Sequence, residues 1–454
     1  MATLNNKNWR GEPLKATIYF SDSLTYTVYN KKSYSDSPNF IESLSLRLTE
    51  GNNKVNPLGI SSSNSITLKI FDMQDNLSPA NKNSPYAGKM VNGIKINLEI
   101  SYDGVTWDPY GQYYSTSWSG TFSDGYNGLV SINADDKLNT IGNLELPELP
   151  AYSNVKIRDL IAYVMEGLNI STSEYSIDPS LDDSLTYGIV AGSKVRDFLN
   201  NVCQLMFARV IIDREGIIRF IPALNTYSNS NELTISREYT GSLSNKINSN
   251  INYNKVAVKY LEAGDTSTEQ LFNDSNHILS EGANKITDIS FKFRALSIEQ
   301  VTVLYEPNET NSYIDKISYR GYQNGIELDI DVSNGPINNC QIIGYGTIVS
   351  TYTKEITAPV DDTAVIGGST FTFDTKQMLT KAEASQLLNK LQEYMTKIGR
   401  NIIISGSALT PRLYIGDKLN IENTNTLYDG SYKVIDVDIT YSENYELSAT
   451  LIRL

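Results

Sequence analysis

Most of the chain alternates apolar and polar residues with a period of two, which is the pattern of half-buried β-strands. The alternation is clearest before residue 147, in the runs ATIYF, SITLKIFD, GIKINLEISY, YYSTSWS and LVSINA. Turn-forming Asn, Gly, Ser and Asp residues separate these runs, and Asp103-Gly104 lies where such a dipeptide favours a hairpin. The pattern therefore predicts an antiparallel β-barrel domain over residues 1–148.

Only three segments show the apolar period of an amphipathic helix. Pro147 and Pro150 interrupt the β pattern, and two helical segments follow, each expected to be capped by a serine, Ser153 or Ser193. Their apolar stripes are Ile157, Leu160, Ile161, Val164, Met165 and Leu168, then Val195, Phe198, Leu199, Val202, Cys203 and Met206. Two apolar strands flank a plain turn at 213–216. Residues 149–225 are therefore predicted to form a small α/β domain.

Strands return after residue 226, and the third helix lies among them. Thr380 and Glu383 match the T-x-x-E capping box, and Gly399 is expected to end the helix. Its apolar stripe is Ala384, Leu387, Leu388, Leu391, Met395 and Ile398. We assign 226–263 and 360–454 to a second β-barrel domain with one helix, and 264–359 to an inserted β domain. The predicted fold is mainly β, with two antiparallel β-barrel domains, a small α/β unit and inserted domains.

Two hairpins far apart in the chain share a pattern that suggests an internal duplication. Gly93 and Gly416 each precede an alternating strand, IKINL in the first hairpin and DKLNI in the second. The returning strand opens with Gly-x-Tyr in both, ending at Tyr113 and Tyr432. Hairpins also share such patterns by chance, so duplication and coincidence both stay open. A real duplication would let a trimer present six similar barrels around one axis, because homo-oligomers favour closed symmetry.

Composition argues against several classes of function. The 454 residues hold 38 Lys and Arg against 52 Asp and Glu, a formal charge of −14 that opposes binding to phosphate backbones and anionic membranes. One histidine, His277, and two distant cysteines leave the usual zinc, Ser-His-Asp and Cys-His sites without enough members. Neither a secretory signal nor an apolar membrane-spanning run is found. No catalytic residue, metal site or cofactor is predicted.

Aromatic and acidic residues offer the few candidate sites. Trp107, Trp118, Tyr113 and Tyr114 could stack on sugar rings, but alternation places the two tyrosines on opposite faces of a strand. Packing in the core or in an interface is the favoured interpretation. The candidate barrel or interface positions are Trp107, Tyr113, Trp118, Gly416 and Tyr432. The acidic pair Asp135-Asp136 is interpreted as a solvated turn.

Four stretches resemble, in the same order, phage tail hub proteins: the baseplate hub of contractile tails, or the N-terminal structural part of tail-associated lysins. The first is LSPANKNSPYAGKMVNGIKINLEISYDGVTW with GQYYSTSWS and INADDKL. The others are SKVRDFLNNVCQLMFARVIIDREGIIRFIPA, YNKVAVKY, and LYIGDKLNIEN with DGSYKVIDVDITY and LSATLIRL. Their shared order over most of the chain carries the resemblance, which is weak over 264–359.

The resemblance implies a homotrimer in which two tube-like barrels per chain give pseudo-six-fold symmetry. Such a hub would lie at the tail tip or baseplate of a virion, join the hexameric tail tube to the tip or spike, and form part of the DNA channel. Its implied partners are the tail tube or distal tail protein, the tape-measure protein and a spike or tip protein. DNA is implied only as the transiting genome, without membrane insertion, and synthesis takes place in the host cytoplasm. Any lytic activity is expected on a different polypeptide.

Two other classes of function stay open. A glycan-binding, β-rich adhesin of the tail tip would use the Tyr/Trp surface, and a carboxylate-based glycosidase would need a catalytic Asp or Glu. The net charge suggests one further hypothesis: acidic residues line the channel, because negative walls repel the phosphates of passing DNA.

Overall fold

The structure is a computed structural model that describes residues 13–30, 39–49, 64–78, 81–101, 103, 105–123, 127–151, 154–181, 184–187, 189, 192–226, 230, 232–236, 242–246, 253–306, 312–360, 369–398, 401–406, 413–422, 428–442 and 445–454. Within these ranges the chain forms 25 strands and four α-helices. The mainly β fold expected from the period-two alternation is therefore confirmed.

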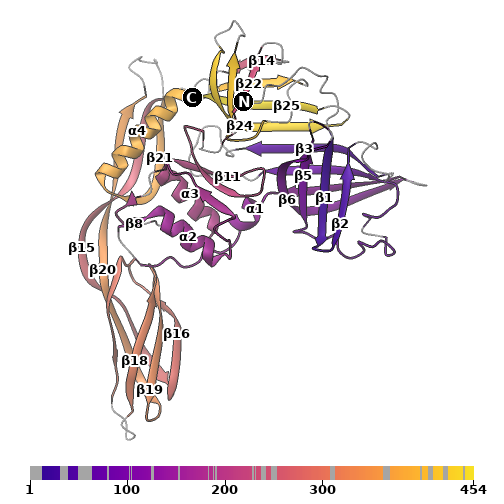
Figure 1. The fold of residues 1–454 in the computed structure, drawn as a ribbon. Helices are drawn as coiled ribbons and strands as arrows, with labels where there is room; N and C mark the ends of the chain where they lie inside the picture. Colours follow the sequence, from indigo (N-terminus) through magenta and orange to yellow (C-terminus); the bar gives the residue numbers. More distant parts are fainter. Residues whose placement is uncertain are drawn as a thin grey trace.

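The largest sheet contains strands from both ends of the chain. Its N-terminal strands are β1 (Leu14–Ser21), β2 (Leu24–Tyr29), β3 (Phe40–Thr49), β4 (Ser65–Asp72), β5 (Lys95–Ile100), β6 (Asp108–Ser123) and β7 (Asn127–Asp135). Its C-terminal strands are β13 (Glu232–Ser236), β14 (Ser242–Lys246), β22 (Asn401–Gly406), β23 (Lys418–Glu422), β24 (Gly430–Tyr441) and β25 (Tyr445–Arg453). We call these thirteen strands the main sheet (Figure 1).

The two predicted barrels are joined rather than separate. The main path of the sheet is β14-β22-β25-β24-β3-β4-β7-β6-β5-β1-β2, with β23 pairing β24 and β13 pairing β23. The antiparallel pair β3–β24 connects the strands of the first half to those of the second. In β4 and β5 every second side chain is buried, and these side chains share one core with those of β24 and β25. The alternation thus predicted the strands, while the joining of the halves became visible only in the structure.

A helical unit lies beside the main sheet. Its elements are α1 (Lys137–Gly142), β8 (Val155–Lys156), α2 (Ile157–Gly167), β9 (Tyr175–Ile177), β10 (Ser184–Leu185), α3 (Val195–Met206), β11 (Ala208–Ile212) and β12 (Ile218–Pro222). The apolar stripes predicted for α2 and α3 are buried in one core with side chains of β11 and β12, except for Leu168, which is half-buried. Cys203 is a buried free thiol within this core.

The predicted helix caps have different outcomes. Lys194, not Ser193, is the N-cap of α3, and its backbone amide donates to the carboxylate of Asp197 at 3.4 Å. Ser153 lies outside the described residues. Thr380 and Glu383 form the expected capping box before α4 (Lys381–Ile398): the Glu383 amide donates to Thr380 Oγ1 at 3.2 Å, and the Thr380 amide donates to Glu383 Oε2 at 2.6 Å. Gly399, expected to end this helix, is also outside the described residues.

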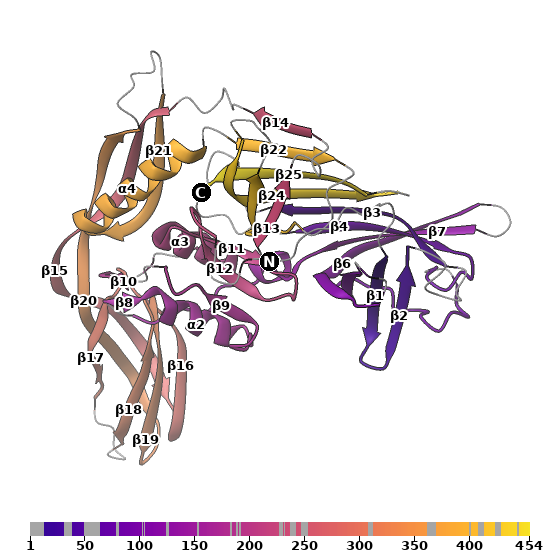
Figure 2. The same cartoon turned by 45° about the horizontal axis from the view of Figure 1, so that its top comes forward.

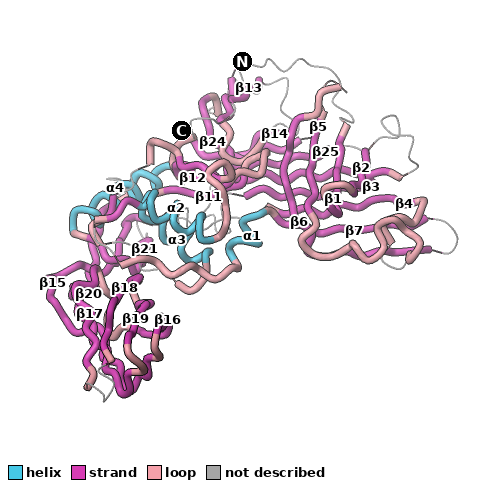
Figure 3. The backbone as a smooth tube through the Cα atoms, turned by 60° about the horizontal axis from the view of Figure 1, so that its bottom comes forward, coloured by secondary structure: helices cyan, strands magenta, loops and turns pink. Residues whose placement is uncertain are grey.

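The remaining strands build a long arm. They are β15 (Tyr253–Leu279), β16 (Gly282–Ser290), β17 (Ser297–Leu304), β18 (Tyr313–Gly321), β19 (Gly325–Ser333), β20 (Ile337–Pro359) and β21 (Ser369–Leu379). β15 and β20 pair along most of their length, and with β16 to β19 their far halves form a distal lobe with its own core (Figure 2). In Figure 3 the helices lie between this lobe and the main sheet.

The arm differs from the division expected from the sequence. The boundary expected at residue 263 falls inside β15, which continues as one strand from Tyr253 to Leu279. The near half of β15, together with β21 and α4, shares its core with α2 and α3 rather than with the main sheet. Alternating burial is the same in any half-buried sheet, so the pattern could not show which sheet these strands join.

Candidate assembly site at the duplicated hairpins

The two hairpins that share a sequence pattern also share their pairing register. In β5–β6, Ile96 lies opposite Tyr113, and in β23–β24, Leu419 lies opposite Tyr432. The long strand of each hairpin then has a bulge two residues after the tyrosine, between Ser115 and Ser117 in β6 and between Val434 and Asp436 in β24. Bulges change the twist and register of a strand locally, so a bulge at the same place is a specific shared feature. The structure therefore supports duplication over coincidence.

The glycine that precedes each hairpin has the same conformation and the same bond. Gly93 has φ +86° and its amide donates to the carbonyl of Ser115 at 2.7 Å. Gly416 has φ +83° and its amide donates to the carbonyl of Val434 at 2.8 Å. A positive φ costs little only for glycine, which explains why both repeats carry this residue here. The candidate position Gly416 is thus a backbone turn that starts the second hairpin.

The candidate aromatic residues pack inside the sheet or against its edge strands. Tyr113 and Tyr432 are both buried, with 1% of each side chain exposed. Trp107 lies against the ring of Tyr29, with 5.5 Å between the centroids, and Lys15 Nζ lies 4.8 Å from its centroid. Trp118 donates its indole N–H to the carbonyl of Val91 at 3.0 Å. These aromatic side chains therefore make contacts within the chain instead of forming an open surface for sugar rings. Their role in an interface stays a prediction.

The turn at 213–216, interpreted from the sequence as plain, joins the two halves of the main sheet. Arg214 Nη2 lies 2.7 Å from Asp417 Oδ2, and the Asp417 side chain is 2% exposed. The Arg214 guanidinium also lies 5.9 Å from the ring centroid of Tyr110 and 5.2 Å from that of Tyr414. Tyr110 belongs to β6 and the other two residues precede β23, so one arginine contacts both repeats. Sequence reasoning missed this junction because the partners are far apart in the chain.

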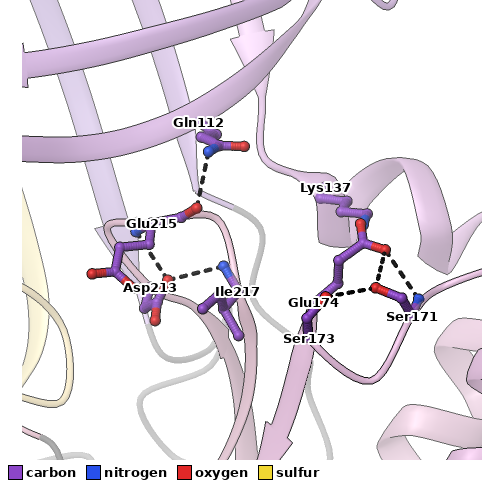
Figure 4. Close-up of polar contacts among 8 residues, drawn as sticks. All are labelled: Gln112, Lys137, Ser171, Ser173, Glu174, Asp213, Glu215 and Ile217. Carbon is purple, nitrogen blue, oxygen red and sulfur yellow. Dashed lines mark hydrogen bonds and ion pairs between the residues drawn. The ribbon is translucent and has the colours of Figure 1, made fainter.

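Further hydrogen bonds complete the junction between the repeats. Gln112 Nε2 donates to the carbonyl of Glu215 at 2.9 Å, which links β6 to the tip of the β11–β12 hairpin (Figure 4). The Tyr110 hydroxyl donates to the carbonyl of Leu413 at 2.9 Å, and the Tyr414 hydroxyl donates to the carbonyl of Ile212 at 3.2 Å. On the next strand the fully buried Lys433 ammonium donates to the carbonyl of Pro222 at 2.8 Å. The β11–β12 hairpin therefore contacts both repeats, and Tyr110 joins them directly.

The acidic pair 135–136 is not a solvated turn. Asp136 is 1% exposed and caps α1, a short helix that the sequence did not predict. Its carboxylate accepts from the amides of Asn64 at 2.7 Å and Leu138 at 3.0 Å. Burial raises the pKa of Asp136 to about 7, because removal from water disfavours the charged form more than these bonds favour it. The side chain is a structural cap rather than a paired acid–base group.

A second polar cluster connects α1 to the helical unit. Lys137 Nζ lies 2.5 Å from Glu174 Oε1, and Glu174 Oε2 accepts from the amide and hydroxyl of Ser171, both at 3.0 Å (Figure 4). The hydrogen bond from Lys137 is the main cause that lowers the pKa of Glu174 to about 2. Over the described parts of the chain, no cluster of acidic, His or Cys side chains could hold a metal ion.

Solved structures with a similar fold identify the fold of this chain. Neither a protein-family model nor a curated protein matches the chain. The tail protein from Neisseria meningitidis MC58 is similar over 98% of this chain and 97% of its own, at 9% identity and a TM-score of 0.54. The 43 kDa tail protein of prophage MuSo2 from Shewanella oneidensis covers 98% of both chains at 8% identity and a TM-score of 0.55. The chain thus has the fold of phage tail proteins, as the resemblance indicated.

Of the helices that the structure describes, none is both long and apolar enough to cross a membrane.

Proposed function

We propose that the chain is a structural protein of a phage tail or a tail-like particle. Three copies form a hub that joins the hexameric tail tube to the tail tip or spike, and the hub surrounds part of the DNA channel. Its other contacts are with the tape-measure protein and with the tube or distal tail protein, and its role is not enzymatic. The observation that carries this proposal is the duplicated hairpin within a tail-protein fold that spans the whole chain.

The duplication supports a three-fold hub on a six-fold tube for a geometric reason. Each chain presents two backbone surfaces with the same register and the same bulge. Three chains would therefore present six such surfaces, and each could make the same contact with one subunit of a hexameric ring. The buried pair Arg214–Asp417 would hold the two surfaces of one chain at a fixed spacing.

Two measurements test this role. The mass of the purified chain in solution, with negative-stain imaging at high concentration, should give a trimer and a ring with six lobes and an open channel. The same preparation should bind the tail tube protein encoded by the same phage or element. A monomer that does not bind the tube protein would contradict the proposal.

A glycan-binding role has one supporting observation, which lies along the arm rather than at Trp107 and Trp118. Tyr313 and Tyr319 on β18 and Tyr352 on β20 are 47%, 44% and 59% exposed. Exposed tyrosines are common at binding surfaces because the ring is apolar and the hydroxyl is polar. Retention of the chain on host cell-wall polysaccharide, lost in the Tyr352→Ala variant, would favour this second function.

A further inference from the structure

The two repeats differ at one edge of the main sheet. In the second repeat, the edge of β24 beyond β23 is covered: Asp436–Tyr441 pairs with β3 in antiparallel fashion, Asp436 opposite Thr49 and Tyr441 opposite Leu44. In the first repeat, residues 117–122 of β6 occupy the same place after the bulge and pair with β7. Within the described residues, no strand pairs with the opposite edge of this segment, because the β5–β6 ladder ends at Tyr114.

The register identifies the strand that is missing there. We start at the residue before each bulge and move across the sheet, each time to the residue directly opposite on the next strand. The first repeat gives Ser115, Ala134, Ile66 and Leu46, and the second gives Val434, Leu451, Ile402 and Asn245. The strand set β5-β6-β7-β4-β3 therefore matches β23-β24-β25-β22-β14, and β14 is the counterpart of β3.

The counterpart strand has an open edge of its own. β3 pairs with β4 on one side and with β24 on the other, whereas β14 is the last strand of the sheet and pairs with β22 alone among the described strands. Figure 2 shows β14 at one limit of the main sheet, with β6 far from it. In the part of each chain that the structure describes, β14 thus lacks a second neighbouring strand, and residues 117–122 of β6 lack a strand on their open edge. The internal pair β3–β24 shows how two such strands can pair.

Burial differs between the two edges at two of three equivalent positions. Ser117, Ser119 and Gly120 of β6 are exposed. Of their counterparts under the cover of β3, Asp436 and Ile439 are 7% and 1% exposed, whereas Asp438 is exposed like Ser119. Small and polar residues on the open edge suit a strand that is exposed in a single chain and is covered only after assembly, because long apolar edges aggregate.

We propose that β14 of one copy of this chain pairs, antiparallel, with residues 117–122 of β6 in the next copy. The register follows the internal pair β3–β24: Ser119 lies opposite Lys246 as Asp438 lies opposite Arg47, and Gly120 lies opposite Asn245 as Ile439 lies opposite Leu46. The occupant is a second copy because the chain itself holds both complementary edges. The contact adds main-chain hydrogen bonds between sheets, as in other strand-addition interfaces.

This pairing deepens the proposed function, and it rests on that function for the number of copies. Each chain has one donor strand and one acceptor edge, so the contact is head-to-tail and generates a closed ring when the rotation closes. In a ring of three, the β3–β24 pairs within chains would alternate with the β14–β6 pairs between chains. The main sheets would then form one continuous wall with six equivalent joints.

Cysteine crosslinking tests the pairing in the full chain. Directly opposed residues in antiparallel strands have Cα atoms about 4.5–5.5 Å apart, within the range a disulfide needs. The double variant S119C/K246C should give covalent dimers and trimers under mild oxidation, and either single variant should give none. Background is low because the native Cys203 and Cys340 are buried. A shifted pair, S119C/S244C, should crosslink much less, because its residues are diagonal neighbours.

The internal joint supplies a matched control. The variant R47C/D438C has the equivalent register within one chain and should form its disulfide without any covalent oligomer. The pairing would be overturned, and the trimeric hub left intact, by one result. The chain would form oligomers of native mass and the R47C/D438C disulfide, but S119C/K246C would give no covalent dimers or trimers. A chain that stays monomeric and uncrosslinked at the highest attainable concentration also overturns it, and binding to the tube protein then decides the hub role separately.

Discussion

The two repeats of the main sheet share a central set of five strands and differ at their flanks. In the first repeat, β5 pairs antiparallel with β1, which continues into β2 as a hairpin. In the second, β23 pairs in parallel with β13, which arrives from the helical unit. The register of the central strands is kept even where their side chains differ. The comparison shows that the two repeats share the pairing register of their five central strands, whereas the strands that flank this set differ.

The edges of the two repeats show the same contrast in side-chain chemistry. After the bulge, Asp436, Val437 and Ile439 of β24 are buried beneath β3 or within the core, whereas Asp438 is exposed. β6 continues with Ser, Trp, Ser and Gly, and its edge stays open in a single chain. The covered edge can be apolar because folding covers it, whereas the open one must stay soluble until another copy arrives.

The largest expected effect comes from separating the repeats at their junction. Arg214→Ala leaves the buried Asp417 carboxylate without its ion pair, and removal of one partner of a buried pair typically costs about 3–5 kcal/mol. Because Arg214 is 23% exposed, we expect the lower end of that range, about 3 kcal/mol of the free energy of unfolding. Urea denaturation measures it.

An exposed pair at the other joint is the matched control for Arg214. Arg47 Nε and Asp438 Oδ1 are 4.0 Å apart with more than half of each side chain exposed. Arg47→Ala should change the free energy of unfolding by less than about 1 kcal/mol, because surface ion pairs contribute little. Equal losses for the two variants would show that the Arg214 contact is no more than a surface pair.

The next effect tests whether the glycine turns are equivalent. Gly93→Ala and Gly416→Ala each place a side chain at positive φ, which costs about 1–2 kcal/mol for a non-glycine residue. A Cβ at Gly93 would meet no atom within 4 Å, so backbone strain alone sets its cost. Gly93→Asn should lose less, because asparagine tolerates this conformation. Losses that differ widely between the two alanine variants, measured by thermal unfolding, would argue against an equivalent turn.

The sequence predicted local features well and long-range contacts poorly. The apolar stripes of α2 and α3 and the Thr380–Glu383 capping box were visible because they depend on residues within a few positions of one another. The duplicated hairpin was visible because its glycines and Gly-x-Tyr openings are required by the backbone itself. α1 was missed because its six residues are too few to show a helical period.

The junction was hidden for a different reason. Arg214 and Asp417 are each unremarkable as charged residues near turns, and no local pattern relates them. Likewise, nothing around Asp136 shows that the amide of Asn64 arrives from a distant strand to bury it. Such polar contacts depend on how the strands are ordered in the sheet, which alternation leaves undetermined.

An effect of similar size, on pH dependence, should be confined to the first repeat. Burial raises the pKa of Asp136 to about 7, above about 3.9 for an unfolded aspartate. The folded state therefore holds a proton that the unfolded state has lost, and stability from this group falls as pH rises from about 4 to about 7. Between pH 5 and pH 7 the free energy of unfolding should fall by about 1 kcal/mol per pH unit more than in Asp136→Asn. Parallel pH profiles of the two proteins in urea titrations would rule out a protonated Asp136.

The smallest effect distinguishes two equivalent positions by what they touch. Gln112 and Ser431 hold the same place in their hairpins, opposite Asn97 and Asn420. Gln112 donates to the carbonyl of Glu215 across the junction, whereas the Ser431 hydroxyl donates to Asn420 within its own hairpin. Either alanine variant should cost about 0.5–1.5 kcal/mol, the usual contribution of one neutral hydrogen bond.

Double-mutant cycles with Arg214→Ala separate these two positions. Gln112 contacts the hairpin tip to which Arg214 belongs, so their losses should not add, and a coupling of about 0.5 kcal/mol or more is expected. Ser431 has its partner inside its own hairpin, so its loss should add to that of Arg214 within about 0.5 kcal/mol. Coupling for both positions, or for neither, would mean that equivalent residues in the two repeats also make equivalent contacts. The hairpin tip would then not be the element that distinguishes one repeat from the other.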